Sequence, residues 1–355
     1  MNFEVDRTDL HRCRVVDDPR RDLGPGEARL EVDAFALTAN NITYAVAGDM
    51  LRYWDFFPTE APWGRVPVWG FADVMESRHD DLAVGTRVYG YLPMGTELVV
   101  SPGRVDNTGF TDRAAHRAAM AAAYNRYARQ PSPPAGGAHA EDQRMVLSPL
   151  FVTSFLIDDA IADGAPAPGD RVILSSASSK TALGTAFCLR RRGDLEVIGL
   201  TSPGNVTVVE SLGVYDRVVG YGDEAALDVA PSVFVDIAGS AAVRLAVHEH
   251  LGADLRSSMI VGVTHWDAPP ASGALPGPAP SMFFAPDRIA ARSRDWGRGE
   301  LDARLEAVWR EYAAWTDGWL RYEHHAGPEA LEQVYRALLD NAADPTVGFV
   351  IRPRP

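Results

Sequence analysis

Residues 171–204 read RVILSSASSKTALGTAFCLRRRGDLEVIGLTSPG, and this stretch decides the fold. The pattern predicts a buried strand at 172–174, a small polar loop at 175–181, a helix at 182–191 and a second buried strand at 197–200. A strand, a tight loop, a helix and a strand form one half of a dinucleotide-binding unit. We therefore expect an α/β protein with a Rossmann, doubly wound parallel sheet.

The loop of such a unit must admit a pyrophosphate. Its backbone amides approach the anion, and the following helix adds free N–H groups and the positive end of its dipole. Of the three glycine positions in G-x-G-x-x-G, only Gly184 is kept, because Ser179 and Thr181 occupy the others. Small polar side chains still fit there, so the predicted cofactor-binding residues of this segment are Ser178, Ser179, Lys180, Thr181 and Gly184.

One residue of this loop stands out by composition. The chain has 34 Lys and Arg residues, and all of them except Lys180 are arginine. One interpretation is that Lys180 is an exposed side chain without a role. The other is a compact ammonium group that reaches a cofactor phosphate where the planar guanidinium of arginine would not fit.

Length and composition restrict the remaining choices. With 355 residues and 46% hydrophobic content, the chain is long enough for two globular domains. Its net charge of −14 argues against nucleic acid or an anionic membrane as a partner. Cys13 and Cys188 are too few for a disulfide framework or a structural zinc cage. The charged N-terminal segment and the lack of a long apolar run predict a cytoplasmic protein.

The part of the chain before the dinucleotide-binding unit predicts a small β-barrel. Glycine turns separate short strands, which we expect at 28–37, 70–74, 82–90 and 97–100. An insertion at about 103–145 interrupts this pattern, with an alanine-rich helix at 112–127 and a flexible loop rich in Pro and Gly after it. A further long helix is expected to begin at Ser148.

Several segments in this order resemble the medium-chain dehydrogenase/reductase superfamily, and especially its zinc-free quinone oxidoreductase branch. They are "PGEARLEV", "GTRVYGY", "PGDRVILSSAS", "ESLGVYDRVVGYGD", "VFVDIAGS" and "MIVGV". Within the superfamily, "YWDFFP", "YNRY", "SPLFVTSFLIDD" and "FFAPDRI" are most similar to a group known mainly as a domain of unknown function. The resemblance implies a GroES-like β-barrel domain at 1–150, including the insertion, a Rossmann domain at 151–322, and a return to the barrel at 323–355.

The resemblance also bears on metal binding, because zinc-dependent members of the superfamily carry zinc ligands that this chain lacks. They have a cysteine near the start of the barrel domain and Gly-His-Glu where Gly70, Phe71 and Ala72 stand here. The histidine pairs at 248 and 250 and at 324 and 325 do not combine with other ligands at a metal spacing. We therefore predict no bound metal.

The end of the second Rossmann strand predicts the cofactor. An NAD enzyme places Asp or Glu there to bind the ribose 2′-hydroxyl. Here the first acid after Leu200 is Glu210, in the following helix, so we expect NADPH. Ser202 and Asn205 can donate to its 2′-phosphate. The resemblance places Tyr221 beside the same phosphate and assigns the nicotinamide carboxamide to main-chain groups of Gly262, Val263 and Thr264.

Candidate catalytic residues come from the insertion and the helix after it. The resemblance implies that Thr153 lies beside the nicotinamide. Tyr124 or Tyr127 could donate a proton, or each could pack in the core with its hydroxyl satisfied. A second set of polar and aromatic residues could line a substrate pocket or form ordinary core or dimer surface: Asn40, Asn41, Tyr44, Tyr53, Trp54, Phe57, Phe283 and Phe284.

These expectations combine into one function with one alternative. The expected function is a metal-independent, NADPH-dependent reductase that transfers hydride to an electron-poor carbon of a small molecule, such as an enone or a quinone. The alternative is a catalytically silent NADPH-binding protein with a structural or redox-sensing role. A homodimer is compatible with either.

Overall fold

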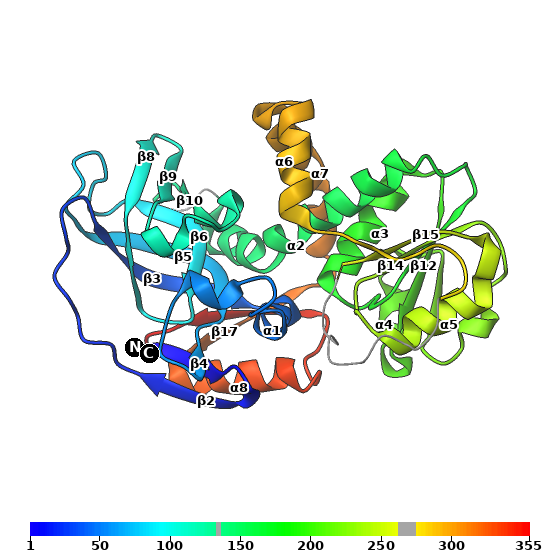
Figure 1. The fold of residues 1–355 in the computed structure, drawn as a ribbon, viewed down its shortest axis with the longest axis horizontal. Helices are drawn as coiled ribbons and strands as arrows, with labels where there is room; N and C mark the ends of the chain where they lie inside the picture. The colour runs from blue at the N-terminus through cyan, green and yellow to red at the C-terminus, as the bar shows by residue number, and fades with distance from the viewer. Residues whose placement is uncertain (133–135, 262–274) are drawn as a thin grey trace. The chain divides into compact units, whose positions relative to one another are not determined.

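The computed structural model describes residues 1–132, 136–261 and 275–355 (Figure 1). The chain divides into two compact units, which we describe separately. Unit 1 consists of Met1–Pro149 and Leu320–Pro355, and unit 2 of Leu150–Trp319. The predicted residues Gly262, Val263 and Thr264 lie outside the described residues.

Unit 1 is rich in β-structure. Its larger sheet has the order β17 (Arg321–Ala326), β18 (Val347–Arg352), β3 (Ala28–Leu37), β5 (Pro67–Ser77), β6 (Arg87–Pro93), β10 (Arg126–Arg129), β9 (Gly109–Asp112) and β8 (Pro102–Asp106), with β7 (Glu97–Val100) also paired to β3. A smaller sheet has the order β2 (Asp9–Val16), β1 (Asn2–Asp6) and β4 (Trp63–Gly64). Helices α1 (Ala39–Val46) and α8 (Pro328–Leu339) complete the unit. The predicted strands at 28–37 and 97–100 are confirmed at their bounds.

The predicted helix at 112–127 is wrong. After β9 the chain makes two short 3-10 turns, at Ala115–Arg117 and Ala122–Asn125, and then enters β10, which pairs with β6 and β9. Alanine has the highest helix propensity, but intrinsic propensity is a weak preference, and tertiary pairing overrides it here. The long helix also begins earlier than expected: α2 runs from Gly137 to Asp163.

Helix α2 is, among the described residues, the one helix whose length and apolar character would suit a membrane span. The expectation that no such apolar run exists was therefore wrong. Half of its most apolar window is buried inside the protein. Leu147, Phe151 and Ile157 are each at most 2% exposed, so these side chains belong to the packed core.

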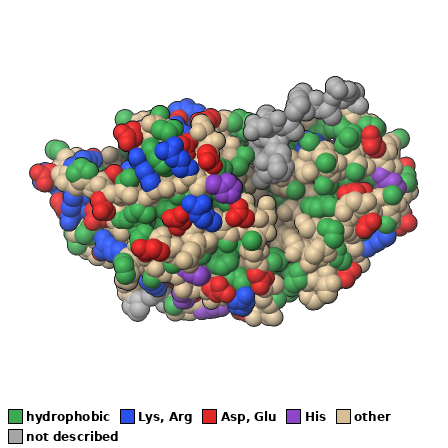
Figure 2. Space-filling model, turned by 90° about the horizontal axis from the view of Figure 1, so that it is seen from below, with side chains coloured by type: hydrophobic (Ala, Val, Ile, Leu, Met, Phe, Trp, Pro, Cys, Tyr) green, Lys and Arg blue, Asp and Glu red, His purple; other side chains and the backbone are tan. Residues whose placement is uncertain are grey.

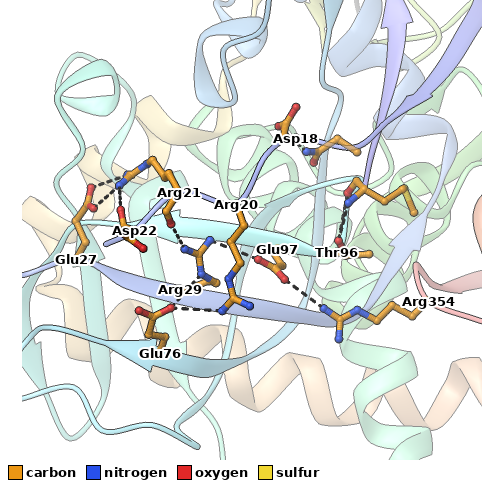
Figure 3. Close-up of polar contacts among 12 residues, drawn as sticks. Asp18, Arg20, Arg21, Asp22, Glu27, Arg29, Glu76, Thr96, Glu97 and Arg354 are labelled. Atoms are coloured by element: carbon orange, nitrogen blue, oxygen red, sulfur yellow. Dashed lines mark hydrogen bonds and ion pairs between the residues drawn. The ribbon is translucent and has the colours of Figure 1, made fainter. Parts of the chain in front are cut away.

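A network of ion pairs fastens both chain ends to unit 1 (Figure 3). Arg29 on β3 is 4% exposed and contacts Glu76 and Glu97, each at 3.4 Å. Arg354 reaches the same Glu97 at 3.6 Å, and the N-terminal amine donates to the neighbouring Thr96 at 3.0 Å. Figure 1 accordingly shows the two termini side by side.

Unit 2 is a parallel sheet with the order β13 (Arg217–Gly220), β12 (Glu196–Thr201), β11 (Arg171–Leu174), β14 (Ser232–Asp236), β15 (Leu255–Ile260) and β16 (Ser281–Met282). All five neighbouring pairs are parallel. Numbered by their succession in the unit, the strands have the order 3-2-1-4-5-6 of a Rossmann sheet. The predicted fold class is thus confirmed for this unit.

Helices α3 (Lys180–Arg192), α4 (Val206–Ser211), α5 (Ala241–Leu251), α6 (Ala285–Asp295) and α7 (Arg298–Thr316) accompany the sheet. The bounds of α3 follow from its sequence. The Ser179 side chain accepts the Ala182 amide at the N-terminus, and Gly193 takes the left-handed conformation (φ 81°) after the last turn. Leu183, Ala186 and Leu189 bury one face of α3 against Val172 and Val197 of the sheet.

The charged surface mixes both signs. In the view of Figure 2, Lys and Arg side chains are interspersed with Asp and Glu over the described surface. On α7 the charges form exposed i,i+4 pairs, such as Arg298 with Asp302 and Arg310 with Glu306, both at 3.0 Å. Such exposed pairs each contribute only a few tenths of a kcal/mol, roughly 0.3–0.5.

Candidate functional site

The loop after β11 lies at the edge of the sheet where parallel strands end. We call residues 175–179 the serine loop; it joins β11 to α3. Its strand is flanked by β12 on one side and β14 on the other. The connections leave in opposite directions at this point, and open α/β sheets bind their ligands at the carboxyl ends of the strands there. The serine loop is therefore the first part of a candidate binding site.

A group of hydroxyl and amide side chains joins the serine loop to the end of β12. The Ser178 hydroxyl accepts hydrogen bonds from Asn205 Nδ2 at 3.2 Å and from Thr201 Oγ1 at 3.4 Å. Ser202 follows Thr201 and is exposed. The predicted cofactor residues Ser178 and Asn205 thus lie together, and Thr201 is an additional member that the sequence did not single out.

The first turn of α3 places Lys180 and Thr181 directly after its capping residue Ser179. The carbonyl oxygen of Thr181 accepts the Ser154 hydroxyl at 2.8 Å, which ties α3 to α2. Gly184 serves the same contact, because a Cβ there would lie 2.7 Å from Ser154 Oγ. Gly184 is therefore required for helix packing. Thr153, next to Ser154 on α2, is half-buried.

Tyr221 follows β13, and its hydroxyl accepts the backbone N–H of Ser176 at 2.7 Å. Burial raises the pKa of this phenol to about 12, although the Ser176 amide opposes the rise. The phenol is therefore protonated at neutral pH. The predicted cofactor residue Tyr221 thus contacts the serine loop directly.

A buried carboxylate joins the ends of β11 and β14. Asp236 is fully buried, and it accepts the Ser175 hydroxyl at 2.9 Å and Arg244 at 2.7 Å. The Ser175 hydroxyl in turn accepts the amides of Ile237 and Ala238 at 2.8 and 3.0 Å. Burial raises the pKa of Asp236, while Ser175 and Arg244 oppose the rise. We call the pair of Ser175 and Asp236 the clasp; it connects the loop after β11 with the loop after β14.

The remaining predicted residues of unit 2 are Phe283 and Phe284. The Phe283 amide donates to Ile260 at the end of β15 at 2.8 Å, and its half-buried ring packs on the apolar core of the unit. Phe284 is half-buried and caps the start of α6. Both residues therefore lie close to the carboxyl end of the fifth strand.

Unit 1 contains an aromatic cluster, which we call the tyrosine cluster. Its members are Tyr44, Tyr53, Phe56, Trp69, Tyr91 and Tyr124, linked by ring contacts of 4.5–6.3 Å. The hydroxyls of Tyr53 and Tyr124 lie 3.3 Å apart, and Trp69 Nε1 donates to the Tyr44 hydroxyl at 3.4 Å. The Tyr91 hydroxyl is buried and has no hydrogen-bond partner among the described residues. The cluster thus offers several phenol donors in an apolar setting.

The two tyrosines that could donate a proton differ sharply in this structure. Tyr127 is fully buried; its hydroxyl donates to the Tyr91 carbonyl at 2.6 Å and accepts from Arg117 at 3.1 Å. It therefore takes the packed alternative that the sequence left open. Tyr124 is partly exposed, and burial raises its pKa well above the ordinary value. Tyr124 remains the candidate proton donor.

Other predicted pocket residues have packing roles. Trp54 is 2% exposed and fits against two glycine backbones, since a Cβ at Gly48 or Gly64 would lie 2.1 or 2.5 Å from its ring. Asn41 caps α1 by accepting the Thr38 amide at 2.8 Å and donates to the Pro67 carbonyl. The buried Phe57 ring lies under Arg117 at 4.9 Å, and the half-buried Asn40 contacts the phenol of Tyr44.

No group of three or more His, Cys, Asp or Glu side chains is placed to hold a metal ion within the described ranges. His248, from one predicted pair, is fully buried and bonds Ser258 and the Pro276 carbonyl at 2.9 and 2.8 Å. His324, from the other pair, contacts Asp142 at 2.8 Å. Metal independence stays a prediction.

The model of one protein family matches most of the chain. It is described as "Protein of unknown function (DUF2855)", and it matches residues 35–344. The chain belongs to this family. No curated protein matches the sequence of this DUF2855 member.

Solved structures match the DUF2855 chain over both units. CurA from Vibrio vulnificus, in complex with NADPH, is 13% identical with a TM-score of 0.63, covering 100% of this chain and 99% of that one. The CurF ER cyclopropanase from the curacin A biosynthetic pathway is 15% identical with a TM-score of 0.62, covering 96% and 95%. The yhdH oxidoreductase from Salmonella enterica, in complex with NADP, is 14% identical with a TM-score of 0.54, covering 96% and 95%. These likenesses confirm the predicted fold, a Rossmann domain together with a β-rich domain.

In this DUF2855 chain, Thr201, Ser154 and Asp236 are among the contributors to the candidate site that sequence reasoning missed. Their partners lie far away in sequence; Ser175 and Asp236, for example, are 61 residues apart. A weak signal was present for Asp236, which ends an apolar strand as the first polar residue after Val233, Phe234 and Val235.

Proposed function

We propose that this protein is a metal-independent, NADPH-dependent reductase of small molecules. The observation that carries the proposal is the polar group of Ser178, Thr201 and Asn205 at the end of β12, where an NAD enzyme would carry an acid. Hydroxyl and amide donors tolerate a 2′-phosphate, whereas a carboxylate would repel it. The fold adds support, because CurA and the TarJ of S. aureus were both crystallised with NADPH.

The residues of unit 2 suit the parts of such a cofactor. Ser178, Ser202 and Asn205 would donate to the 2′-phosphate, and the Lys180 ammonium would add the positive charge. The N-terminus of α3, with Ser179 and Thr181, would receive the pyrophosphate, because its first N–H groups have no partner within the helix. Thr153 is proposed to lie beside the nicotinamide. The clasp of Ser175 and Asp236 would hold these loops rigid.

When bound, the cofactor supplies a hydride to an electron-poor carbon, and we propose an enone or a quinone as the acceptor. The tyrosine cluster would wall the substrate pocket with apolar rings. The hydroxyls of Tyr53 and Tyr124 share one hydrogen bond, so the hydroxyl hydrogen left over would be donated to the oxygen on which negative charge develops. Tyr124 would then deliver the proton, since Tyr124 is the partly exposed residue of the pair and Tyr53 is buried.

One observation favours the silent, dinucleotide-binding alternative. Burial raises the pKa of Tyr53 and of Tyr124, so neither phenol releases its proton readily near neutral pH. General acids work best with a pKa near the operating pH. A protein that binds NADPH through unit 2 without turning a substrate over would show such phenols as ordinary core residues.

A binding and turnover experiment separates the two functions. Calorimetric titration first measures NADPH binding, and a panel of quinones and enones is then mixed with protein and NADPH while the loss of NADPH absorbance is followed. Oxidation that depends on an acceptor supports the reductase. Tight binding without oxidation by any acceptor supports the silent protein, and no binding would contradict both. We also propose that the protein is cytoplasmic.

A further inference from the structure

The serine loop is held by hydrogen bonds at most of its amides. The N–H of Ser175 donates to Val235 at 3.0 Å, that of Ala177 to Leu200 at 2.9 Å, and that of Ser179 to Ser176 at 2.7 Å. The Ser176 N–H donates to the hydroxyl of Tyr221. Three of these four bonds reach carbonyl oxygens of the backbone, so Ser176 alone among them relies on a side chain.

Ser176 is also the strained residue of the loop. Its φ is +53°, in the left-handed region that glycine occupies easily and that residues with a Cβ rarely adopt. The strain must be offset by the surroundings. The next residue is fixed on both sides, because the Ala177 N–H bonds Leu200 and its carbonyl accepts the Tyr215 hydroxyl at 3.0 Å. The Tyr221 bond to Ser176, at 2.7 Å, completes this restraint.

We propose that Tyr221 is a positioning residue of the dinucleotide-binding loop: its hydroxyl holds Ser176 in the left-handed conformation that glycine adopts unaided. The inference rests on the dinucleotide binding proposed above. A loop with a serine in this left-handed conformation needs an external restraint, and Tyr221 supplies it from beyond the third strand. Tyr221 therefore acts on the whole loop and not on one phosphate.

This role differs in its consequences from that of a phosphate ligand. A ligand of the 2′-phosphate would strengthen NADPH binding and leave NADH binding unaffected. A residue that shapes the serine loop strengthens both, because the loop and the start of α3 receive groups that NADPH and NADH share. A glycine at position 176 should also make the Tyr221 hydroxyl dispensable, whereas it could not replace a phosphate ligand.

The test is a double-mutant cycle of Tyr221→Phe and Ser176→Gly, with dissociation constants for NADPH and NADH measured by calorimetry. We expect Tyr221→Phe to weaken the binding of both cofactors by a similar factor, about 3- to 10-fold, as for one lost neutral hydrogen bond. In the Ser176→Gly background the same change should have a clearly smaller effect. Tyr335→Phe is the matched control, since it removes a phenol hydroxyl that bonds the Leu10 carbonyl in unit 1.

Hydrogen exchange of the residue 176 amide, in the protein without cofactor, provides a second readout. Protection in the wild type that is lost in Tyr221→Phe supports the restraint. Three results would overturn the inference. They are a loss of affinity for NADPH alone, an equal effect of Tyr221→Phe in the wild-type and Ser176→Gly backgrounds, and unchanged protection of the residue 176 amide in Tyr221→Phe. If the wild type binds neither cofactor, the proposed function fails, and the exchange measurement still decides whether Tyr221 restrains the loop.

Discussion

The hydroxyls of Tyr53 and Tyr124 face one another at 3.3 Å within the tyrosine cluster of unit 1. Either phenol can be the donor in this pair, so one hydroxyl hydrogen is left for a third group. A carbonyl oxygen placed beside them would accept that hydrogen. The pair is thus the feature of unit 1 that most resembles a prepared site for a developing oxyanion.

Tyr124→Phe should therefore slow reduction of the substrate without weakening the binding of NADPH. General acid catalysis contributes roughly 10²- to 10⁴-fold, so we expect kcat to fall within that range while the dissociation constant of NADPH is unchanged. Steady-state kinetics and calorimetry measure the two. Tyr127→Phe is the comparison, since its hydroxyl bonds only the Tyr91 carbonyl and Arg117 in the core and its loss should lower the melting temperature instead. Equal kcat for Tyr124→Phe and the wild type would remove Tyr124 from the mechanism.

Lys180→Ala should weaken NADPH binding by about 1–3 kcal/mol, the scale of a hydrogen bond to a charged group. Lys180→Arg should recover only part of this loss, because the larger planar fork must enter a tight loop. Measuring NADH as well locates the contact: a partner of the 2′-phosphate affects NADPH alone, and a partner of the pyrophosphate affects both. Unchanged constants for both cofactors in a folded variant would show that Lys180 has no part in binding.

Gly184→Ala should destabilise unit 2 through the contact of α3 with α2. The new Cβ would lie 2.7 Å from Ser154 Oγ, which is fixed by bonds to the Leu150 and Thr181 carbonyls. Overpacking of this kind costs roughly 1–3 kcal/mol. Thermal and denaturant unfolding measure the change. Gly299→Ala, in an open position on α7, is the control and should not lower the stability; a Gly184→Ala variant as stable as this control would contradict the packing role.

Asp158 on α2 gives a pH dependence to stability. Burial raises its pKa from 3.8 to about 6, although Arg192 at 3.0 Å opposes the rise. Because the folded-state pKa lies above the unfolded one, this group stabilises the protein below pH 4 and loses that contribution as the pH rises through 6. The loss amounts to at most about 3 kcal/mol, from roughly 1.36 kcal/mol per pKa unit.

The corresponding measurement compares Asp158→Asn with the wild type from pH 4 to pH 8. Asparagine cannot ionise, so the melting temperature of the variant should rise relative to that of the wild type as the pH increases through 6. A difference between the two proteins that is constant over this range would show that Asp158 titrates normally in the folded state.

The local pattern of residues 171–204 was sufficient to predict the Rossmann unit. Apolar runs mark β11 and β12, and Ser179 and Gly193 cap the helix between them. All of these signals lie within a few residues of the element they define. The same holds for β3, whose apolar and polar residues alternate between turns. For such elements, local sequence and tertiary structure agree.

The features that sequence reasoning missed depend on distant partners. The alanines of 112–127 suggested a helix, but β10 in that segment is set by its pairing with β6 and β9 and by the fit of Tyr127 against Gly90, where a Cβ would lie 2.5 Å from the ring. The clasp of Ser175 with Asp236 joins strands that are neighbours only in the folded sheet. The Tyr221 bond to Ser176 spans 45 residues. Contacts of this range leave no periodic signal in the sequence.

We propose that the carboxyl end of β12 selects NADPH. Calorimetric titration of the wild-type protein with NADPH and with NADH, at the same pH and ionic strength, tests it most directly. Since Ser178, Ser202 and Asn205 offer donors and the sequence has no acid between Leu200 and Glu210, we expect clearly tighter binding of NADPH. Equal affinities, or tighter binding of NADH, would contradict it.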